Sequence, residues 1–357
     1  MGEILGIGMT HYPGLNGPDN NFTAPLRFVL GNEAVPENLK DPANWPEPMR
    51  REWGDDQGTT AGRQHREALV AELRKVRQAI DDFKPDFIIV WGDDQYENFK
   101  DEIIPAFCVL AYDSVELQPW AKSTVTGSAF WGEWKNTWNE PPEKKFVMKG
   151  HRAGAKYAAS SLLEQGFDIA YAYRPLHKNL GHAFLNTFLF LDYGRKGFDY
   201  PIVPFAVNCY GRRVVAQHGS LISISDSSEA EMDPPSPMPW RCFDLGRTVA
   251  RALTESPWRT VLIGSSSWSH GTLTAKNWYL HPDAERDHEM FESLKAGDFE
   301  KWRQTPLAAL EESGQQEMLN WMCMVGAMAE LGRKPDDAVF IESWVCNSNK
   351  CFAYFKP

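Results

Sequence analysis

The segment Val261-Leu262-Ile263-Gly264-Ser265-Ser266-Ser267-Trp268-Ser269-His270 joins a short apolar run to a serine-rich stretch that ends in a histidine. Its apolar part, residues 261–263, is typical of a strand that is buried on both faces of a parallel sheet. Three other apolar runs end in polar residues in the same way, leading to His11, to Asp93-Asp94-Gln95 and to Asn208. Because ligands of open α/β sheets bind beyond the carboxyl ends of the strands, this pattern predicts an enzyme with its active site at that edge.

The composition is that of a globular protein. The chain has 357 residues, of which 43% are hydrophobic, and this is enough for one large α/β domain. Its net charge of −11, with no basic block, argues against nucleic acid or an anionic membrane as a partner. No apolar run reaches transmembrane length, and the N-terminal residues lack the charged region of a signal peptide. The six cysteines lack zinc-type spacing, so we expect reduced thiols in a cytoplasmic protein.

Helical and strand patterns alternate along the chain. Apolar residues recur three or four positions apart from Leu69 to Phe83, which predicts a helix that ends before Lys84-Pro85, and a strand over 87–91 follows directly. Further helices are predicted over 153–165, from His182 onward, over 242–253 and over 316–331, with strands over 167–173, 338–345 and 351–355. This alternation predicts an α/β fold with a mostly parallel central sheet flanked by helices, as a single domain over 1–357. The last two strands are candidates for an antiparallel pair.

Two stretches, 23–60 and 118–149, interrupt the alternation and are rich in Pro, Asn, Gly and Trp. We expect both to be long loops, which inside a domain often serve as lids or binding loops. The tryptophans of the second stretch could line an aromatic pocket, or they could instead hold the loop to the surface; they are Trp120, Trp131, Trp134 and Trp138.

Three histidines and one glutamate have the positions expected of active-site residues. His11 and His270 follow strands, and His182 opens an apolar helix. A mononuclear non-haem iron(II) site combines two imidazoles with one carboxylate, and strand ends that are distant in sequence converge in space. Glu317 precedes a nearly apolar helix, so its carboxylate is expected to be buried. A metal ion is one partner for a buried carboxylate, while the alternative is a favourable interaction with the helix dipole.

Taken in order, these residues resemble the motifs of the class III extradiol ring-cleavage dioxygenases, in particular the catalytic beta subunits of protocatechuate 4,5-dioxygenases. The resemblance runs nearly end to end. It implies that His11 and Glu317 bind iron, that His270 is the catalytic acid and base, and that His182 orients the substrate. The similar segments are 8–13, 93–99, 149–151, His182 with the helix after it, 204–208, 241–246, 264–270 and 311–327.

The resemblance implies an Fe(II)-dependent extradiol-type dioxygenase that cleaves a catecholic or related phenolic ring with O₂. Its partners are then a small aromatic substrate and O₂, and we expect Asn208, Trp268 and Asp93 to contact the substrate. We also expect a homo-oligomer, most simply a dimer. In the protocatechuate enzymes a separate small subunit helps to close the site, and the stretches 23–60 and 118–149 could replace it here.

One departure from the family concerns the metal. Gln95 stands where the family has its second iron-binding histidine. A glutamine carbonyl oxygen is a weaker and harder donor than imidazole, so Gln95 as third ligand should lower the metal affinity, alter the redox potential or shift the metal preference towards Mn(II). Asp93 or Asp94 could bind in its place, or the site could be empty. The alternatives to a dioxygenase are a metal-poor, non-catalytic paralogous subunit and a metal-dependent hydrolase or lyase on the same scaffold. The presence of His11, His182, His270 and Glu317 together favours the enzyme.

Overall fold

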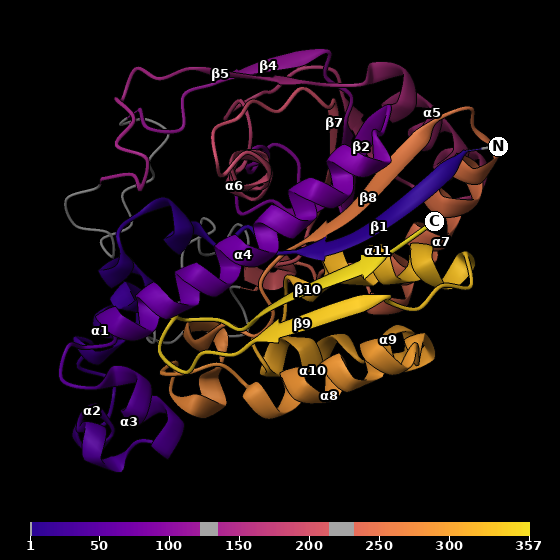
Figure 1. The fold of residues 1–357 in the computed structure, drawn as a ribbon. Helices are drawn as coiled ribbons and strands as arrows, with labels where there is room; N and C mark the ends of the chain where they lie inside the picture. Colours follow the sequence, from indigo (N-terminus) through magenta and orange to yellow (C-terminus); the bar gives the residue numbers. More distant parts are fainter. Residues whose placement is uncertain (1, 122–134, 214–231) are drawn as a thin grey trace.

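The computed structural model describes residues 2–121, 135–213 and 232–357, and within them a central eight-stranded sheet carries the fold (Figure 1). The strand order is β6-β3-β7-β2-β8-β1-β10-β9. Its four middle strands, all parallel, are β7 (Ile202–Val207), β2 (Phe87–Asp93), β8 (Arg259–Ser265) and β1 (Glu3–Met9). The outer strands are β3 (Phe107–Leu110) and β6 (Ala170–Ala172) on one side, and β10 (Lys350–Phe355) and β9 (Asp337–Ile341) on the other.

Register brings the ends of the four middle strands to one edge of the sheet. Gly264 pairs with Gly8 on one side and with Trp91 on the other, and Asp93 pairs with Val207. The polar residues that follow these strands therefore emerge side by side. The predicted α/β fold with a mostly parallel sheet is confirmed, and so is the late antiparallel pair, because β10 runs antiparallel to both β9 and β1.

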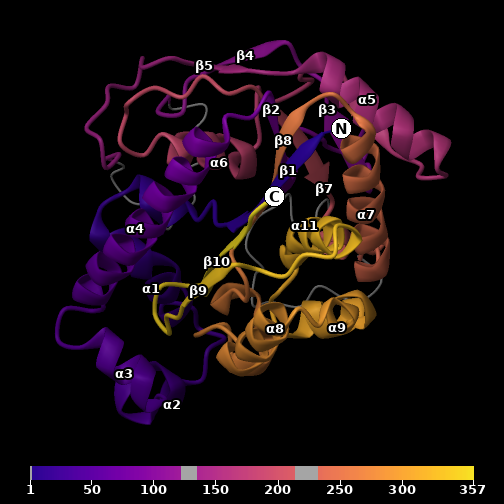
Figure 2. The same cartoon turned by 45° about the vertical axis from the view of Figure 1, so that its right-hand side comes forward.

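Helices cover both faces of the sheet (Figure 2). One face carries α4 (Thr59–Phe83), which contacts β1, and α6 (His182–Leu191), which contacts β2. The other face carries α5 (Arg152–Glu164), α7 (Pro239–Glu255) and α11 (Met318–Glu330), and α7 and α11 pack against each other and both contact the sheet. The remaining elements are α8 (Ala284–Ala296), α9 (Phe299–Gln304) and α10 (Leu307–Glu312), and a two-stranded sheet of β4 (Ser114–Leu117) and β5 (Phe146–Lys149). Within the described parts of the chain, no helix is both long and apolar enough to cross a bilayer.

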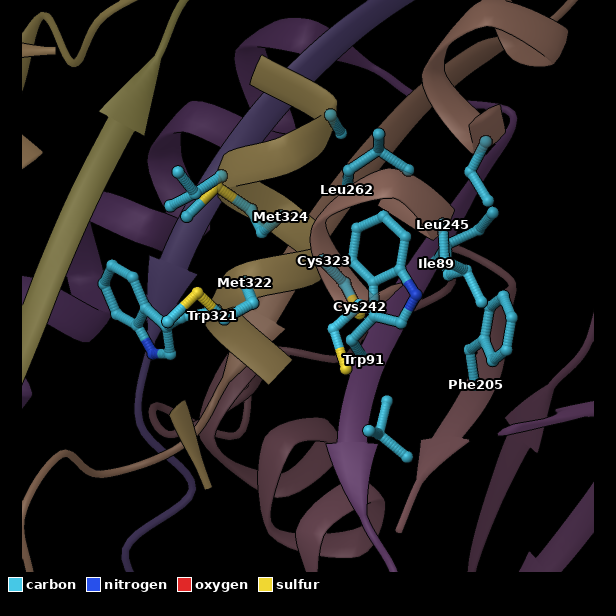
Figure 3. Packing of buried hydrophobic residues seen from close by; sticks show 14 of the residues in the cluster. Ile89, Trp91, Phe205, Cys242, Leu245, Leu262, Trp321, Met322, Cys323 and Met324 are labelled. Carbon is cyan, nitrogen blue, oxygen red and sulfur yellow. The ribbon is translucent and has the colours of Figure 1, made fainter. Parts of the chain in front are cut away.

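Helix α11 is the most deeply buried helix of the site-bearing face. Its residues from Met318 to Met328 are all buried, as its nearly uniform apolar sequence predicts. Figure 3 shows Met324 of this helix and Trp91 of β2 near Leu262 of β8, with Trp321 on the other side of the helix. Burial of these large side chains holds the N-terminal end of α11, and with it Glu317, against the edge of the sheet where the strands end.

Two glycines allow α7 and α11 to pack at close range. A Cβ atom at Gly246 would lie 1.8 Å from the carbonyl oxygen of Cys323, and one at Gly326 would lie 2.0 Å from that of Phe243. Contacts this short leave no room for any side chain, so the helix backbones approach each other directly. This close contact sets the distance between α7 and α11.

The prediction of a long loop over 23–60 was wrong, because most of this stretch is helical. It contains α1 (Ala24–Leu30), α2 (Glu37–Lys40) and α3 (Glu47–Trp53), and α4 begins at Thr59. Proline lies in the first turn of both α1 and α3, where its missing N–H is no loss, so prolines that suggested a loop in fact begin helices.

In the second stretch, 118–149, Trp120 stacks on Trp138 with ring centroids 5.6 Å apart, and β5 closes the stretch. Buried Trp120 thus holds the described part of this stretch to the protein. Trp131 and Trp134 lie outside the described residues.

Replacement of Gly326 by alanine should destabilise the fold, because the new methyl group meets backbone rather than a movable side chain. We expect the free energy of unfolding to fall by about 1–3 kcal/mol or more, as for other overpacked cores. Urea denaturation followed by circular dichroism measures the change. Gly194→Ala is the matched control, since a Cβ there meets only the Lys196 side chain, at 3.9 Å. Equal stability of the two variants would contradict this account of the helix contact.

Candidate metal and active site

Three buried side chains from different elements converge at the strand-end edge. His11 follows β1, Asp93 ends β2 and Glu317 precedes α11, and they are 2%, 0% and 3% exposed. His11 Nε2 lies 3.3 Å from Asp93 Oδ1 and 3.6 Å from Glu317 Oε2. The convergence follows from strand register and from the position of α11.

The hydrogen bonds of His11 determine which of its two ring nitrogens has a free lone pair. This nitrogen is the one that faces the two carboxylates. Nδ1 lies 3.0 Å from the carbonyl oxygen of Ser265, which can only accept, so Nδ1 carries the hydrogen. Burial lowers the pKa of His11 well below its usual value, so the imidazole is neutral. Its Nε2 therefore presents a lone pair to Asp93 and Glu317.

The facing carboxylate oxygens have no hydrogen-bond partner within the described chain. They are Asp93 Oδ1 and Glu317 Oε2, both fully enclosed by protein. Burial, together with the neighbouring Glu317 charge, raises the pKa of Asp93 to about 7, and burial also raises the pKa of Glu317. Two unpartnered carboxylate oxygens and one imidazole lone pair in a buried space are unfavourable unless a cation lies between them. The donor set therefore fits a divalent metal ion.

The second oxygen of each carboxylate is held by protein donors. Gln95 Nε2 lies 3.1 Å from Asp93 Oδ2 and 3.3 Å from Glu317 Oε1. The hydroxyl of Tyr210, in the segment after β7, donates to Glu317 Oε1 at 2.6 Å. Gln95 thus reaches the site predicted for it, with its amide nitrogen towards the carboxylates.

His182 approaches the same space from α6. Its ring centroid is 5.3 Å from that of His11, and one ligand atom each from His11, Asp93 and His182 lie within 4.8 Å of one another. His182 Nδ1 lies 2.6 Å from Glu97 Oε2, and Lys178 Nζ donates to the other oxygen of Glu97 at 2.7 Å. Burial alone would lower the pKa of His182, but the Glu97 carboxylate outweighs it and raises that pKa to about 9.

His270 has the opposite electrostatic environment. Its Nε2 lies 3.5 Å from Glu317 Oε1, and its Nδ1 has no hydrogen-bond partner among the described residues. Burial, with a smaller effect of the buried Lys350 ammonium, lowers the pKa of His270 to about 4. His270 is therefore a neutral imidazole beside the carboxylates, whereas His182 carries a proton shared with Glu97.

A buried carboxylate on α8, Asp287, ties together the segments that carry His270 and Glu317. It accepts hydrogen bonds from the backbone N–H and hydroxyl of Ser269, from Gln315 Nε2 at 2.6 Å and from Asn349 Nδ2 at 2.8 Å. Ser269 precedes His270, and Gln315 lies two positions before Glu317. Asp287 is thus the shared anchor of both active-site segments.

Two residues that we expected to contact substrate lie elsewhere. The ring of Trp268 is 0% exposed and packs among Phe291, Trp302, Trp321 and Phe340, so its role is in the core. The side-chain oxygen of Asn208 accepts from the backbone N–H of Gly211 at 2.9 Å and closes a turn. Their positions after strand ends were correct, but the directions of their side chains depend on turns that the sequence pattern does not describe.

Asp94 is not directed at the metal space either. Its carboxylate accepts backbone N–H groups from Glu97, Asn98 and Phe99 at 3.2, 2.8 and 3.3 Å, and it forms the turn after β2. Of the two adjacent aspartates, only Asp93 faces His11. Asp93 is the last residue of β2, whereas Asp94 belongs to the turn that follows the strand.

Three residues near the site were missed by the sequence analysis. Glu97 and Tyr210 each lie a few positions beyond a predicted strand end, which is the one signal that could have found them. Asp287 lies on a polar helix, α8, and carries no such signal. Its partners are distant in sequence, so only the tertiary structure brings them together.

Residues 55–343 match the family described as the catalytic LigB subunit of aromatic ring-opening dioxygenase. Gln95, His182, His270 and Glu317 lie within this match, and His11 precedes it.

Among curated relatives, the chain is 26% identical over 203 residues to a 2,3-dihydroxyphenylpropionate/2,3-dihydroxicinnamic acid 1,2-dioxygenase of Comamonas testosteroni, covering 57% of this chain and 49% of the relative. It is 23% identical over 213 residues to the protein of the same name from Photorhabdus laumondii, covering 60% and 52%. The chain thus spans about half the length of the curated relatives it matches.

Replacement of Asp287 by alanine should unfold or loosen both active-site segments, because buried donors of Ser269, Gln315 and Asn349 lose their acceptor. We expect the free energy of unfolding to fall by about 2–5 kcal/mol, since each unsatisfied buried donor costs about 1–3 kcal/mol. Thermal and urea unfolding measure the loss. The exposed Asp168 supplies the control variant Asp168→Ala, expected within about 0.5 kcal/mol of wild type. A wild-type stability for Asp287→Ala would rule out the anchoring role.

Proposed function

Because this chain belongs to the family of catalytic LigB subunits of aromatic ring-opening dioxygenases, we propose that it is a non-haem Fe(II)-dependent extradiol-type dioxygenase. Its substrates are a small catecholic or related phenolic compound and O₂. The observation that carries the proposal is the enclosed group of His11, Asp93 and Glu317, whose facing acceptor atoms call for a divalent cation. The names of the curated relatives suggest 2,3-dihydroxyphenyl carboxylic acids as first substrates to assay.

His11 and Glu317 would hold the metal, with a third oxygen donor from the end of β2 or the residues directly after it. Fe(II) is the proposed ion, and Mn(II) is the alternative that a site rich in oxygen donors would accept. When bound, the ion supplies the redox chemistry that couples a diol to O₂. Ser265 fixes the tautomer of His11, and Tyr210 fixes the orientation of Glu317, as outer partners of metal ligands commonly do.

His270 and His182 divide the proton chemistry between them. His270 is neutral and close to Glu317, so it can accept a proton from a substrate hydroxyl and return it later as a general acid. His182, protonated and paired with Glu97, can donate a hydrogen bond to a substrate oxygen and so orient the ring. These opposite protonation states give one acceptor and one donor within the same pocket.

The non-catalytic alternative is less favourable on electrostatic grounds. A silent subunit would bury one oxygen of Asp93 and one of Glu317 near the His11 lone pair without a hydrogen-bond partner for either among the described residues. We also propose that the protein is a cytoplasmic homodimer that needs no separate small subunit. The six cysteines of the chain are all buried and form no disulfide, which agrees with a reducing compartment. They are Cys108, Cys209, Cys242, Cys323, Cys346 and Cys351. Sedimentation of the purified chain tests the dimer.

Anaerobic loading with Fe(II), followed by addition of O₂ and a panel of catechols, tests the activity. We expect O₂ uptake together with loss of the aromatic absorbance, and mass spectrometry with isotopically heavy O₂ should find both oxygen atoms in the ring-opened product. Uptake of O₂ with the aromatic ring left intact, or no uptake with any diol, would overturn the proposed reaction.

Replacement of His270 by alanine should lower turnover about 10²- to 10⁴-fold, the usual contribution of a positioned general acid and base. Metal content should stay at the wild-type level, since His270 is not among the proposed ligands. Turnover and bound metal are measured on the same preparation. His288→Ala is the control, because His288 is exposed on α8 and contacts Glu342. Loss of metal from His270→Ala, with turnover restored by added Fe(II), would reject the acid–base role.

A further inference from the structure

We infer that Asp93, and not Gln95, supplies the third protein ligand beside His11 and Glu317, and that Gln95 holds the two carboxylates from outside the coordination sphere. The inference rests on the proposed metal-dependent function and deepens it. It replaces our sequence-based assignment, in which Gln95 took the position of the missing histidine.

Asp93 has the properties expected of a metal ligand. It is 0% exposed, its Oδ1 has no hydrogen-bond partner among the described residues, and this atom lies 3.3 Å from His11 Nε2. Glu317 is also buried, at 3% exposed, and its Oε2 has no hydrogen-bond partner among the described residues and lies 3.6 Å from the same nitrogen. A single ion adjacent to His11 Nε2 would therefore meet one free oxygen from each carboxylate.

Gln95 engages the opposite oxygens. Its amide nitrogen lies within hydrogen-bond distance of Asp93 Oδ2 and of Glu317 Oε1, and the two hydrogens of an NH₂ group can serve both. The reverse orientation would set the amide oxygen against two carboxylate oxygens, which is repulsive. With its donor face turned to the carboxylates, Gln95 orients the ligands rather than binding the ion.

Asp93 belongs to two groups of possible ligand atoms around His11. In one group, Asp93 Oδ1 and Glu317 Oε2 lie 3.3 and 3.6 Å from His11 Nε2. The other is His11 with Asp93 and His182, whose ligand atoms lie within 4.8 Å of one another. The position of Asp93 in the coordination sphere is therefore independent of whether His182 also binds.

Two carboxylates change the character of the centre. Their combined charge balances that of a divalent ion, whereas a site with one carboxylate and two imidazoles leaves one positive charge. Carboxylate oxygens are hard donors that suit Mn(II), while imidazole favours iron and later metals. We therefore expect the ratio of Fe(II) to Mn(II) affinity to rise in Gln95→His, which adds an imidazole beside the ion.

Metal binding without substrate tests the assignment. Metal-free wild type, Asp93→Asn and Gln95→Ala are titrated with Mn(II) alone, and free Mn(II) is followed by electron paramagnetic resonance. Asp93→Asn keeps the size of the side chain but removes its charge. We expect the affinity of this variant for Mn(II) to fall by more than about 100-fold, beyond what outer-sphere partners contribute. Gln95→Ala should lose only about 10-fold, at the lower end of what outer-sphere partners contribute. Asp168→Asn, at an exposed position, is the control and should bind as wild type does.

Crystals of wild type soaked with Mn(II) supply a measurement that does not depend on the folding of a variant. An anomalous peak about 2.0–2.3 Å from Asp93 Oδ1, with the Gln95 amide in contact only with the carboxylates, is the expected result. A peak bonded to the Gln95 oxygen, or equal affinity losses in Asp93→Asn and Gln95→Ala, would overturn the inference.

The same experiments separate this inference from the proposed function. A wild type that binds Mn(II) or Fe(II) through Asp93, but takes up no O₂ with any diol, supports the ligand assignment and refutes the dioxygenase activity. Ring cleavage by an enzyme whose metal is bonded to Gln95 instead refutes the assignment and leaves the activity standing.

Discussion

Three acceptor atoms facing one another inside the protein constitute the constraint on which the site depends. Asp93 Oδ1 and Glu317 Oε2 are buried without a hydrogen-bond partner among the described residues, and they lie 3.3 and 3.6 Å from His11 Nε2. Such an arrangement is unfavourable in an empty, low-dielectric interior. It persists because each group is fixed by a different part of the fold: two by the ends of parallel strands, and one by a helix packed tightly against them.

The packing on one face of the sheet is therefore part of the chemistry. Direct backbone contact between α7 and α11 at Gly246 and Gly326 holds α11 close, and burial of Trp321 against Gly8 of β1 sets its position along the sheet. Glu317, at the start of α11, follows from this arrangement. The hydrogen-bond network of Asp287 then fixes the neighbouring loop that carries His270. Packing and hydrogen bonds away from the proposed metal site thus determine the distances between the residues of that site.

The two remaining histidines differ in what sets their pKa. Glu97, 2.6 Å from His182 Nδ1, raises the pKa of His182 and keeps it protonated, whereas burial lowers the pKa of His270 and keeps it neutral. This difference gives the site a donor on one side and an acceptor on the other. In the proposed metal site, the amide of Gln95 donates to Asp93 and Glu317, and the Asp93 carboxylate would be the third ligand. Such a centre would have more negative charge than one built on two imidazoles and a single carboxylate.

Local patterns in the sequence were sufficient for the fold and for the neighbourhood of the site. The spacing of apolar residues over 69–83 predicted helix α4. The parallel strands were predicted from the apolar runs before His11, Asp93, Asn208 and His270. Both signals arise from residues that are neighbours in the sequence. Topology then made the convergence of His11 and Glu317 predictable. Side-chain direction was not predictable in the same way. Trp268 enters the aromatic core, Asn208 closes a turn, and Gln95 presents its nitrogen, because each direction depends on a turn or a partner distant in sequence. The helices in 24–53 were missed because proline in a first helical turn resembles proline in a loop until the packing of the whole chain is known.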